Sequence, residues 1–431
     1  MLVTLMAFSI PCLFRSLDRA GGLQTGEWSS SSIWVRSAEC ARTTKGVLVL
    51  CKDGRLVPIA DVSAGDDPGP ALAMAAYAAL TGAVVVEADV SRANTILNYV
   101  GIAALAALLF SLRMPWLSFL VLTGGAAIAN QFHFLGPHPG HFGVACLAAL
   151  LPLAILGAPP ASPSRWLWWL WIALGLAGLA IGMVFREAIG LMGVLSSLLA
   201  LGLGYSLQAG KMRYAALVHI VVGSAVILTI GTPYAILRAR DAVLHIAPSD
   251  RMEQHGAWHN LYIGLGVVEN PFGIVWNDEH GVQTVKRVDP AVKYLSAEYY
   301  AILKREYFRL VLSHPLDVAI IYLRKLAVAL KTYKMWLVLI VAAVVLAFAR
   351  IALMRRLPGW TTFDAVIMVS WIFVATFLGQ AALFNYVELY LFPIKLFLLL
   401  LSGAAVELLF RLWCQKTRLA STEANRVHGM P

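Results

Sequence analysis

The stretch His255–Gly266, HGAWHNLYIGLG, gathers hydrogen-bonding and aromatic side chains in a chain that is mostly apolar. If residues 251–262 form a helix, His255 and His259 lie on one face, because residues four apart in a helix are neighbours. Two imidazoles and the carboxylates that follow, beginning at Asp278, suit several divalent metal ions. The pattern has no third ligand at a defined spacing, so we assign no metal ligand and keep a divalent metal as an alternative.

The same side chains suit a carbohydrate better than a metal. Sugars present hydroxyl groups and weakly apolar C–H faces, which aromatic rings cover while amide, imidazole and carboxylate groups bond the hydroxyls. The sequence therefore predicts a sugar or acceptor pocket, supported by Trp276 and Asn277. Its expected lining residues are His255, Trp258, His259, Asn260, Tyr262 and Asp278. The alternative is a packed loop whose histidines are satisfied by internal hydrogen bonds.

The composition excludes an ordinary soluble protein. Of 431 residues, 59% are hydrophobic and 13% are charged, whereas soluble domains carry about a quarter charged residues. We therefore expect an all-α polytopic membrane protein. The net charge of +10 could suggest nucleic acid, but basic loops also orient membrane helices towards the cytoplasm, and we expect no nucleic-acid partner.

A helix needs about 20 apolar residues to cross the hydrocarbon core of a bilayer, and this rule predicts about ten spans. They lie near residues 2–15, 95–112, 115–130, 141–157, 166–184, 188–207, 214–231, 335–350, 363–382 and 389–411. The first is short and has no basic residue before it, so it is either a truncated helix or a poor signal peptide.

The basic residues of the short loops orient the chain. They are Arg113, Arg165, Lys211, Arg213, Arg350, Arg355 and Arg356, with Arg411, Lys416 and Arg418 in the tail. The positive-inside rule puts this set in the cytoplasm. The long segments 16–94 and 232–334 then face the periplasm of a bacterial inner membrane. We expect three parts: 1–231, a transmembrane module with the first periplasmic loop; 232–334, the second loop; and 335–431, transmembrane helices and a cytoplasmic tail.

The first long loop contains a cysteine pair. Cys40 and Cys51 flank CARTTKGVLVLC, which is typical of a small hairpin. Outside the cytoplasm such a pair forms a disulfide, and the alternative is two unpaired thiols.

Further along this loop, Asp66 and Asp67 precede Pro68 in GDDPGPALAMAAYAALTG. Proline suits the first turn of a helix. An apolar stripe at helical spacing follows and predicts an amphipathic helix on the outer membrane surface. The stripe consists of Leu72, Ala75, Ala76 and Leu80. The two carboxylates at its start are candidates for chemistry, and the alternative is that they only cap the helix.

The second long loop predicts two interfacial amphipathic helices, near 296–313 and 315–333, which meet at the His314–Pro315 step. Arg324 and Lys325 lie midway along the second helix, which argues against a membrane span. The first helix carries Lys304, Arg305 and Arg309. These cations could bind a lipid phosphate or simply anchor the helix at the headgroups of membrane lipids.

Three more charges lie close to the expected outer ends of spans: Arg186, Glu187 and Lys395. Charge near the hydrocarbon core is costly and often marks function. Arg186 and Glu187 have a simpler alternative, which is to pair with each other at the interface.

Together these parts resemble the GT-C glycosyltransferases, multi-span enzymes that transfer a sugar from a polyprenyl-phosphate carrier. The acidic pair that opens the helix at Pro68 is similar to the Asp-containing motif before that family's juxtamembrane helix. The His314–Pro315 step and the stretch ELYLFPIKLFLLL resemble its HP-containing and RYLLPxxP segments. The chain departs from the pattern in Glu388, where a basic residue is common. The acidic pair also lies beyond a hairpin rather than directly after the first helix.

The resemblance implies direct, inverting displacement at the sugar carbon. A phosphate leaving group needs cations or a metal rather than a general acid, and the acceptor hydroxyl needs one carboxylate as base. Asp66 or Asp67 would be the base, with Asp18 and Glu27 as rivals. Candidates for the donor phosphate are Arg186, Lys304, Arg305 and Lys395. The implied partners are a polyprenyl-phosphate-linked sugar and a lipid or glycan acceptor of the cell envelope.

Two other functions compete with this one. An O-antigen polymerase or ligase-like enzyme would depend on outer-loop arginines such as Arg238, Arg240, Arg251 and Arg287. A transporter would show internal repeats, broken helices and charges at mid-membrane. The chain shows no evident repeat, and its charges cluster at helix ends and in the outer loops.

Overall fold

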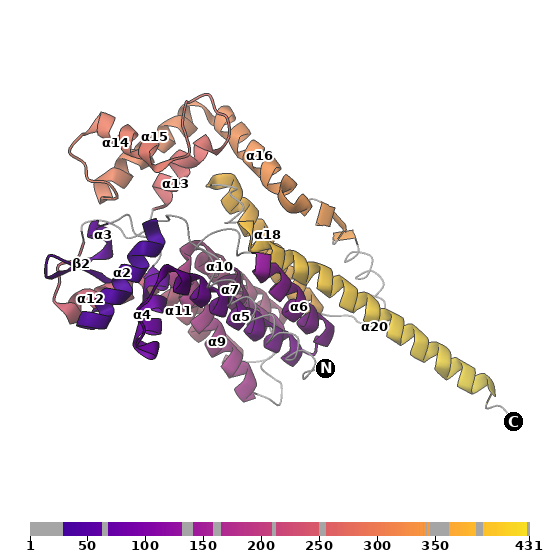
Figure 1. Cartoon of the computed structure of the whole chain (residues 1–431). Helices are drawn as coiled ribbons and strands as arrows, with labels where there is room; N and C mark the ends of the chain where they lie inside the picture. The colour runs from indigo at the N-terminus through magenta and orange to yellow at the C-terminus, as the bar shows by residue number, and fades with distance from the viewer. Residues whose placement is uncertain are drawn as a thin grey trace.

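The computed structural model describes residues 29–62, 68–131, 141–157, 165–208, 213–249, 256–335, 362–384 and 391–428, and most of 337–344. Within these ranges the chain is almost entirely α-helical, with one two-stranded sheet. Figure 1 shows a bundle of helices flanked by two smaller units, one around α2, α3 and α12 and the other formed by α13 to α16. We call these the first and second flanking units.

The bundle contains helices that are long and apolar enough to cross a membrane. Among the described residues four meet this test, or five if the pair Ala216–Thr229 and Thr232–Leu244, bent by 58°, is one span. The four are α5 (Glu87–Ser111), α18 (Thr362–Leu383), Trp166–Phe185 of α9 (Arg165–Phe185) and Glu187–Ser206 of α10 (Glu187–Gln208). The chain is therefore a largely helical, membrane-associated protein.

The remaining expected spans are placed differently. Shorter apolar helices cover Pro115–Ala129, within α6 (Pro115–Gln131), and His141–Gly157, within α7 (His141–Ala148) and α8 (Leu150–Gly157). The segment near 389–411 begins α20 (Ile394–His428), and that near 214–231 is α11 (Arg213–Thr229). Residues 2–15 lie outside the described residues, and 335–350 lie only partly within them.

Polar side chains inside the bundle satisfy helix ends. The first backbone N–H groups of a helix have no partner within it, and in an apolar medium they must find one elsewhere. Asn98 of α5 accepts from the backbone N–H of Gly143, in the first turn of α7, at 2.7 Å. Glu407 of α20 accepts from the N–H of Leu117, in the first turn of α6, at 2.9 Å. These bonds fix how neighbouring helices meet.

The first flanking unit consists of α2 (Ser29–Thr44), β1 (Val49–Lys52), β2 (Arg55–Pro58), α3 (Ile59–Val62), α4 (Pro68–Thr81) and α12 (Thr232–Leu244). The strands pair in antiparallel register from Val49 with Pro58 to Lys52 with Arg55. Asp53 and Gly54 form the turn with φ of 49° and 73°, as a tight two-residue hairpin turn requires. The core lies between α2, the hairpin and α4 and includes Trp34, Leu50 and Met74.

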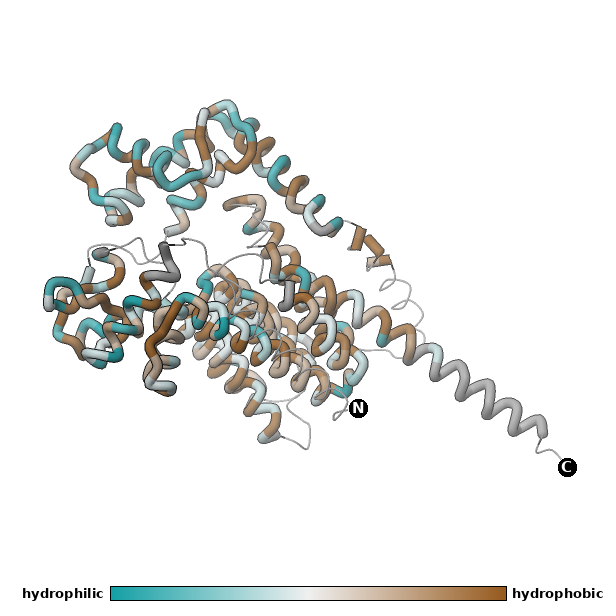
Figure 2. Tube along the Cα trace, viewed as in Figure 1, coloured by the Kyte–Doolittle hydropathy of each residue, from teal (hydrophilic) through white to brown (hydrophobic). Residues whose placement is uncertain are grey.

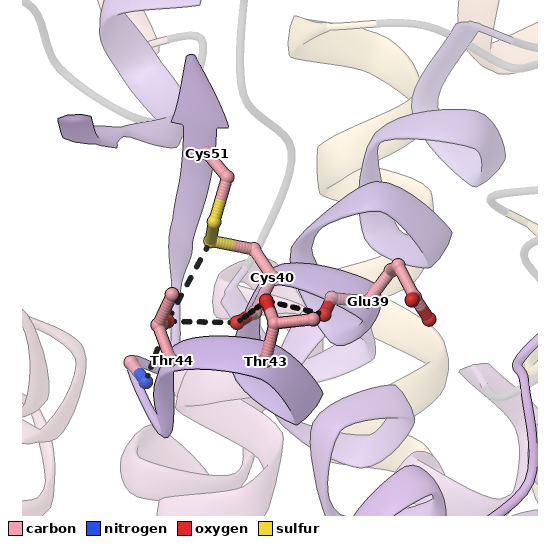
Figure 3. Close-up of a disulfide and its surroundings, with 6 residues drawn as sticks. Glu39, Cys40, Thr43, Thr44 and Cys51 are labelled. Atoms are coloured by element: carbon pink, nitrogen blue, oxygen red, sulfur yellow. Dashed lines mark hydrogen bonds between the residues drawn. A yellow bond between two sulfur atoms is a disulfide. The ribbon is translucent and has the colours of Figure 1, made fainter. Parts of the chain in front are cut away.

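A disulfide joins Cys40 to Cys51, which confirms the predicted bond (Figure 3). The predicted hairpin over 40–51 is wrong in position. Cys40 lies in α2, so the disulfide links a helix to β1, and the hairpin spans 49–58. The Asp53–Gly54 turn lies beyond the second cysteine, and it sets where the chain reverses.

The helix predicted after Asp66 and Asp67 is present as α4 and begins at Pro68, while the two aspartates lie outside the described residues. Its protein-facing stripe differs from the predicted one. Ala71, Met74, Ala75 and Ala78 are buried, whereas Leu80 is 87% exposed. α4 packs against α2, and that contact selects the buried face.

The second flanking unit consists of α13 (Ala257–Gly264), the 3₁₀ turn η2 (Leu265–Val267), α14 (Asp278–Val288), α15 (Ala297–Ser313) and α16 (Pro315–Lys331). The two predicted helices that meet at His314–Pro315 are confirmed as α15 and α16, because Ser296 caps α15 and Pro315 opens α16. The core of this unit is rich in tyrosine: Tyr262, Tyr299, Tyr300 and Tyr307.

The second long loop does not form one separate unit. α12 packs with the first flanking unit, since Ile236 and Leu237 contact its core. The buried guanidinium of Arg240 donates to Asp241 Oδ1 at 2.7 Å and to the carbonyl of Leu48 at 3.1 Å. Part of each long segment therefore belongs to the first flanking unit.

Candidate functional site

The helix that carries the HGAWHNLYIGLG residues begins at Ala257. Gly256 is extended, with φ −61° and ψ 158°, and its N–H donates to the hydroxyl of Tyr300 at 3.0 Å. A continuous helix over 251–262, the condition for His255 and His259 to share a face, is therefore not formed at Gly256. His255 itself lies outside the described residues.

His259 lies at the centre of a buried hydrogen-bonded chain. Its side chain has no exposed surface, its Nδ1 lies 2.8 Å from the hydroxyl of Tyr299, and its Nε2 lies 3.0 Å from Oδ1 of Asp278. An ionised carboxylate only accepts, so Nε2–H donates to Asp278, and in the neutral ring Nδ1 accepts from the Tyr299 hydroxyl. Burial raises the pKa of Tyr299 well above its usual range, which keeps that hydroxyl protonated.

The chain Tyr299–His259–Asp278 ends at the surface, because the side chain of Asp278 is 57% exposed. The first turn of α14 presents this carboxylate, and Asn277 caps that turn by accepting from the N–H of His280 at 2.7 Å. A Cβ on Gly281 would lie 2.9 Å from the Tyr299 hydroxyl and 3.1 Å from Cε1 of His259. Only glycine lets α14 come close enough to the two rings for this bond.

Two residues of the predicted sugar pocket lie buried beneath the exposed carboxylate of Asp278. His259 and Tyr262 are buried, and the hydroxyl of Tyr262 lies 3.2 Å from that of Thr284. Asn260 is partly buried on α13, where its N–H bonds to the carbonyl of Gly256. Asp278 and the partly exposed Trp258 are thus the members of the set that can contact a ligand most directly.

Trp258 meets a predicted phosphate-binding residue. Nζ of Lys304 lies 5.0 Å from the centroid of the Trp258 ring, within the range of a cation–π interaction. Phe308 flanks the same ring at 5.5 Å between centroids. Lys304 and Arg305 are both exposed on α15. The packing of α13 on α15 therefore places the exposed ammonium of Lys304 over the ring of Trp258, and we call this the Trp258–Lys304 surface.

The other predicted phosphate residues lie on the bundle. Arg186 is half-buried between α9 and α10, and Lys395 opens α20 with its Nζ 4.3 Å from the Phe392 ring. α4 begins beside the first of these, because a Cβ on Gly69 would lie 2.5 Å from the ring of Phe185. The helix that follows Asp66 and Asp67 in the sequence thus starts against the neighbour of Arg186.

Lys325 is a polar residue whose role the sequence did not reveal. Its side chain is fully buried, and its ammonium donates to the carbonyls of Gly264, Leu383 and Phe384 at 2.9, 3.1 and 2.8 Å. These carbonyls end α13 and α18, where the helix dipole favours a cation. Burial lowers the pKa of Lys325 to about 7. One side chain of α16 thereby ties the second flanking unit to a bundle helix.

Among the described residues, no group of three or more His, Cys, Asp and Glu side chains could hold a metal ion. No family model, curated protein or solved structure matches the chain.

Proposed function

We propose that this chain is a membrane glycosyltransferase that moves a sugar from a polyprenyl-phosphate donor to a lipid or glycan acceptor. The observation that supports this function best is the Trp258–Lys304 surface, where the exposed ammonium of Lys304 lies over the ring of the partly exposed Trp258. An indole covers the C–H face of a sugar ring. Ammonium and guanidinium groups bind phosphate oxygens, and the guanidinium of Arg305 can do so with two bonds.

The chemistry needs little more than these groups and one base. Lys304 and Arg305 would hold the negative charge that grows on the phosphate as the sugar leaves. Asp278 would accept hydrogen bonds from sugar hydroxyls, with His259 fixing the orientation of its carboxylate. Asp66 or Asp67 would take the proton of the acceptor hydroxyl. Direct displacement inverts the sugar carbon and requires no covalent intermediate.

We propose further that the reaction occurs on the periplasmic side of a bacterial inner membrane, in a protein with about ten spans. The disulfide between Cys40 and Cys51 supports this side for the first flanking unit, because such bonds persist in oxidising compartments. α12 packs with that unit through Arg240 and Leu48, which supports the same side for the second long segment.

The polymerase or ligase alternative depends on outer-loop arginines, and two of these already have partners in the protein. Arg240 is buried against Asp241. Arg238 lies 5.0 Å from the centroid of the Tyr234 ring and donates to its hydroxyl at 2.8 Å. These contacts favour structural roles for both arginines, so we rank single-sugar transfer first.

The test is mass analysis of envelope glycans and glycolipids from cells that lack the protein, complemented with wild type or with variants. The first variants are Trp258→Ala and the pair Lys304→Gln with Arg305→Gln. Loss of a preorganised charge contact costs about 100-fold in rate, so we expect one sugar unit to be missing. Lys286→Gln, an exposed cation on α14, is the matched control and should restore that sugar.

The other outcomes separate the alternatives. Asp66→Asn with Asp67→Asn should match the cation pair if one of these carboxylates is the base. Loss of whole glycan chains above an intact short core would point to the polymerase or ligase. An unchanged glycan profile in cells without the protein would reject both enzymes and favour a transporter.

A further inference from the structure

α16 exposes large apolar side chains on one face, although its buried face is also largely apolar and carries one lysine. The buried face carries Lys325 together with Val318 and Ile321. The exposed face carries Leu316, Ile320 and Leu323, of which Leu316 is 78% and Leu323 65% exposed. A helix at a water-facing surface places its apolar stripe inwards and its charges outwards. The exposed face of α16 is therefore suited to an apolar surrounding.

The apolar face continues around the His314–Pro315 corner onto α15. Phe308 and Leu312 are exposed there, at positions that share a helix face with Arg305 and Arg309. We call the set Phe308, Leu312, Leu316, Ile320 and Leu323 the α15–α16 apolar surface. Figure 2 shows hydrophobic and hydrophilic turns interleaved along α16. Soluble proteins rarely expose a contiguous apolar surface of this kind without a partner.

The position of α16 indicates what covers this surface. α16 packs against α18, one of the candidate spans. Its residue Ala329, and Met335 just beyond its end, belong to the apolar core of the bundle. Leu337 and Ile340 then continue the exposed apolar residues along the chain. The end of α16 thus packs into the bundle that contains the candidate spans.

The arginines near the α15–α16 apolar surface indicate what can bind to that surface. Arg309 and Arg324 are exposed on the same two helices as the apolar residues, and Arg309 forms an ion pair with Glu306 at 2.9 Å. A second copy of the same surface would bring arginines against arginines. A bilayer offers acyl chains for the leucines and phosphate groups for the guanidiniums at the depth where both are found.

We infer that the α15–α16 apolar surface is seated in the outer leaflet of the membrane, with its flanking arginines on the phosphates of anionic lipids. The second flanking unit then rests on the bilayer through this surface and on the bundle through Lys325. The inference stands whether or not the protein transfers sugars, since it concerns only where two helices lie.

The test uses the full-length protein in liposomes, with Cys12, Cys146 and Cys414 replaced by Ala and the disulfide kept. A bimane label is placed on Leu316→Cys, Ile320→Cys or Leu323→Cys, and on Gln283→Cys, an exposed position of α14. We expect brominated lipid to quench the three α16 labels and aqueous iodide to quench the α14 label. Iodide quenching of the α16 labels to the level of Gln283→Cys would overturn the inference. Protection from both quenchers would also overturn it, because a protein partner would then cover the surface.

The charge component has its own measurement. Native mass spectrometry counts the phosphatidylglycerol that stays bound after extraction from mixed phosphatidylglycerol and phosphatidylethanolamine liposomes. Each basic residue near an anionic surface contributes about fivefold in binding at moderate salt. The pair Arg309→Gln with Arg324→Gln should therefore lose most of this lipid, whereas Lys286→Gln should retain it. Equal retention in all three proteins would reject the role of the arginines.

Discussion

The two flanking units are stabilised in different ways. The first has an apolar core of residues such as Trp34, Leu50 and Met74 and is cross-linked by the Cys40–Cys51 disulfide. The second has no disulfide among its described residues, and its core is built from tyrosines whose hydroxyls must find partners. It relies on the Tyr299–His259–Asp278 chain and on the three bonds of Lys325.

Under the proposed function, the second unit binds the ligand and the first unit supports it. In a buried polar network, the loss of one partner leaves the remaining group unsatisfied in a medium of low dielectric constant. Such a network also holds one geometry, which a binding surface needs. The exposed Asp278 carboxylate and the Trp258–Lys304 surface belong to the unit that is built this way.

Replacement of Lys325 should give the largest difference in effect between the second flanking unit and the first. In Lys325→Met the carbonyls of Gly264, Leu383 and Phe384 lose their donor, and each unsatisfied buried group costs about 1–3 kcal/mol. We expect the protein to lose about 3–5 kcal/mol of stability in detergent. Amide hydrogen exchange should rise in α13, α16 and the end of α18 and stay unchanged in α2 and β1.

The control is Arg324→Met, which changes the exposed neighbour on the same helix and should cost less than about 0.5 kcal/mol. The pH dependence of the free energy of unfolding gives a second test of the role of Lys325. Its pKa is about 7 when folded and about 10.4 when unfolded. Above pH 7 the unfolded state binds more protons, so stability should rise with pH towards 10, by less than about 1.4 kcal/mol per unit. Lys325→Met should lack this rise, and a flat wild-type profile would contradict the assignment.

The sequence was sufficient where local signals decide the structure. The His314–Pro315 step and the flanking periodicity predicted α15 and α16 almost to the residue, because proline both ends one helix and opens the next. Pro68 likewise predicted the start of α4. The disulfide followed from the compartment that the topology implied. These features depend on a few consecutive residues and need no knowledge of distant contacts.

The sequence was insufficient where distant partners decide the structure. Gly256 bonds to Tyr300 and is extended, so α13 starts at Ala257 and no helix runs through residue 256. From the sequence, Lys325 indicated only that its helix does not span the membrane, since its spacing cannot reveal that two helix ends converge on it. Trp258 and Lys304 were predicted for a sugar and a phosphate separately, and only the packing of α13 on α15 joins them.

Removal of the disulfide should have a smaller and more local effect than removal of Lys325. Closing a loop of 11 residues stabilises a protein by about 2–3 kcal/mol, mainly by restricting the unfolded chain. The double variant Cys40→Ala with Cys51→Ala should therefore exchange faster in α2, β1 and β2, with α13 to α15 unchanged. Dithiothreitol on the wild type should reproduce the change. Faster exchange in the second unit as well would contradict the independence of the two units.

The smallest expected effect tests the polar network at its innermost member. In Tyr299→Phe the ring stays packed, but Nδ1 of His259 loses its hydrogen-bond donor, which costs about 1 kcal/mol. Denaturant titration in detergent measures this against Tyr234→Phe, which removes the hydroxyl of an exposed tyrosine and should be nearly neutral. Because His259 orients Asp278, we also expect the glycan defect of Tyr299→Phe to be partial and that of Asp278→Asn to be larger. If both tyrosine variants were equally neutral in stability and glycan profile, the second unit would be an aromatic core like any other, and its contrast with the first would rest on Lys325 alone.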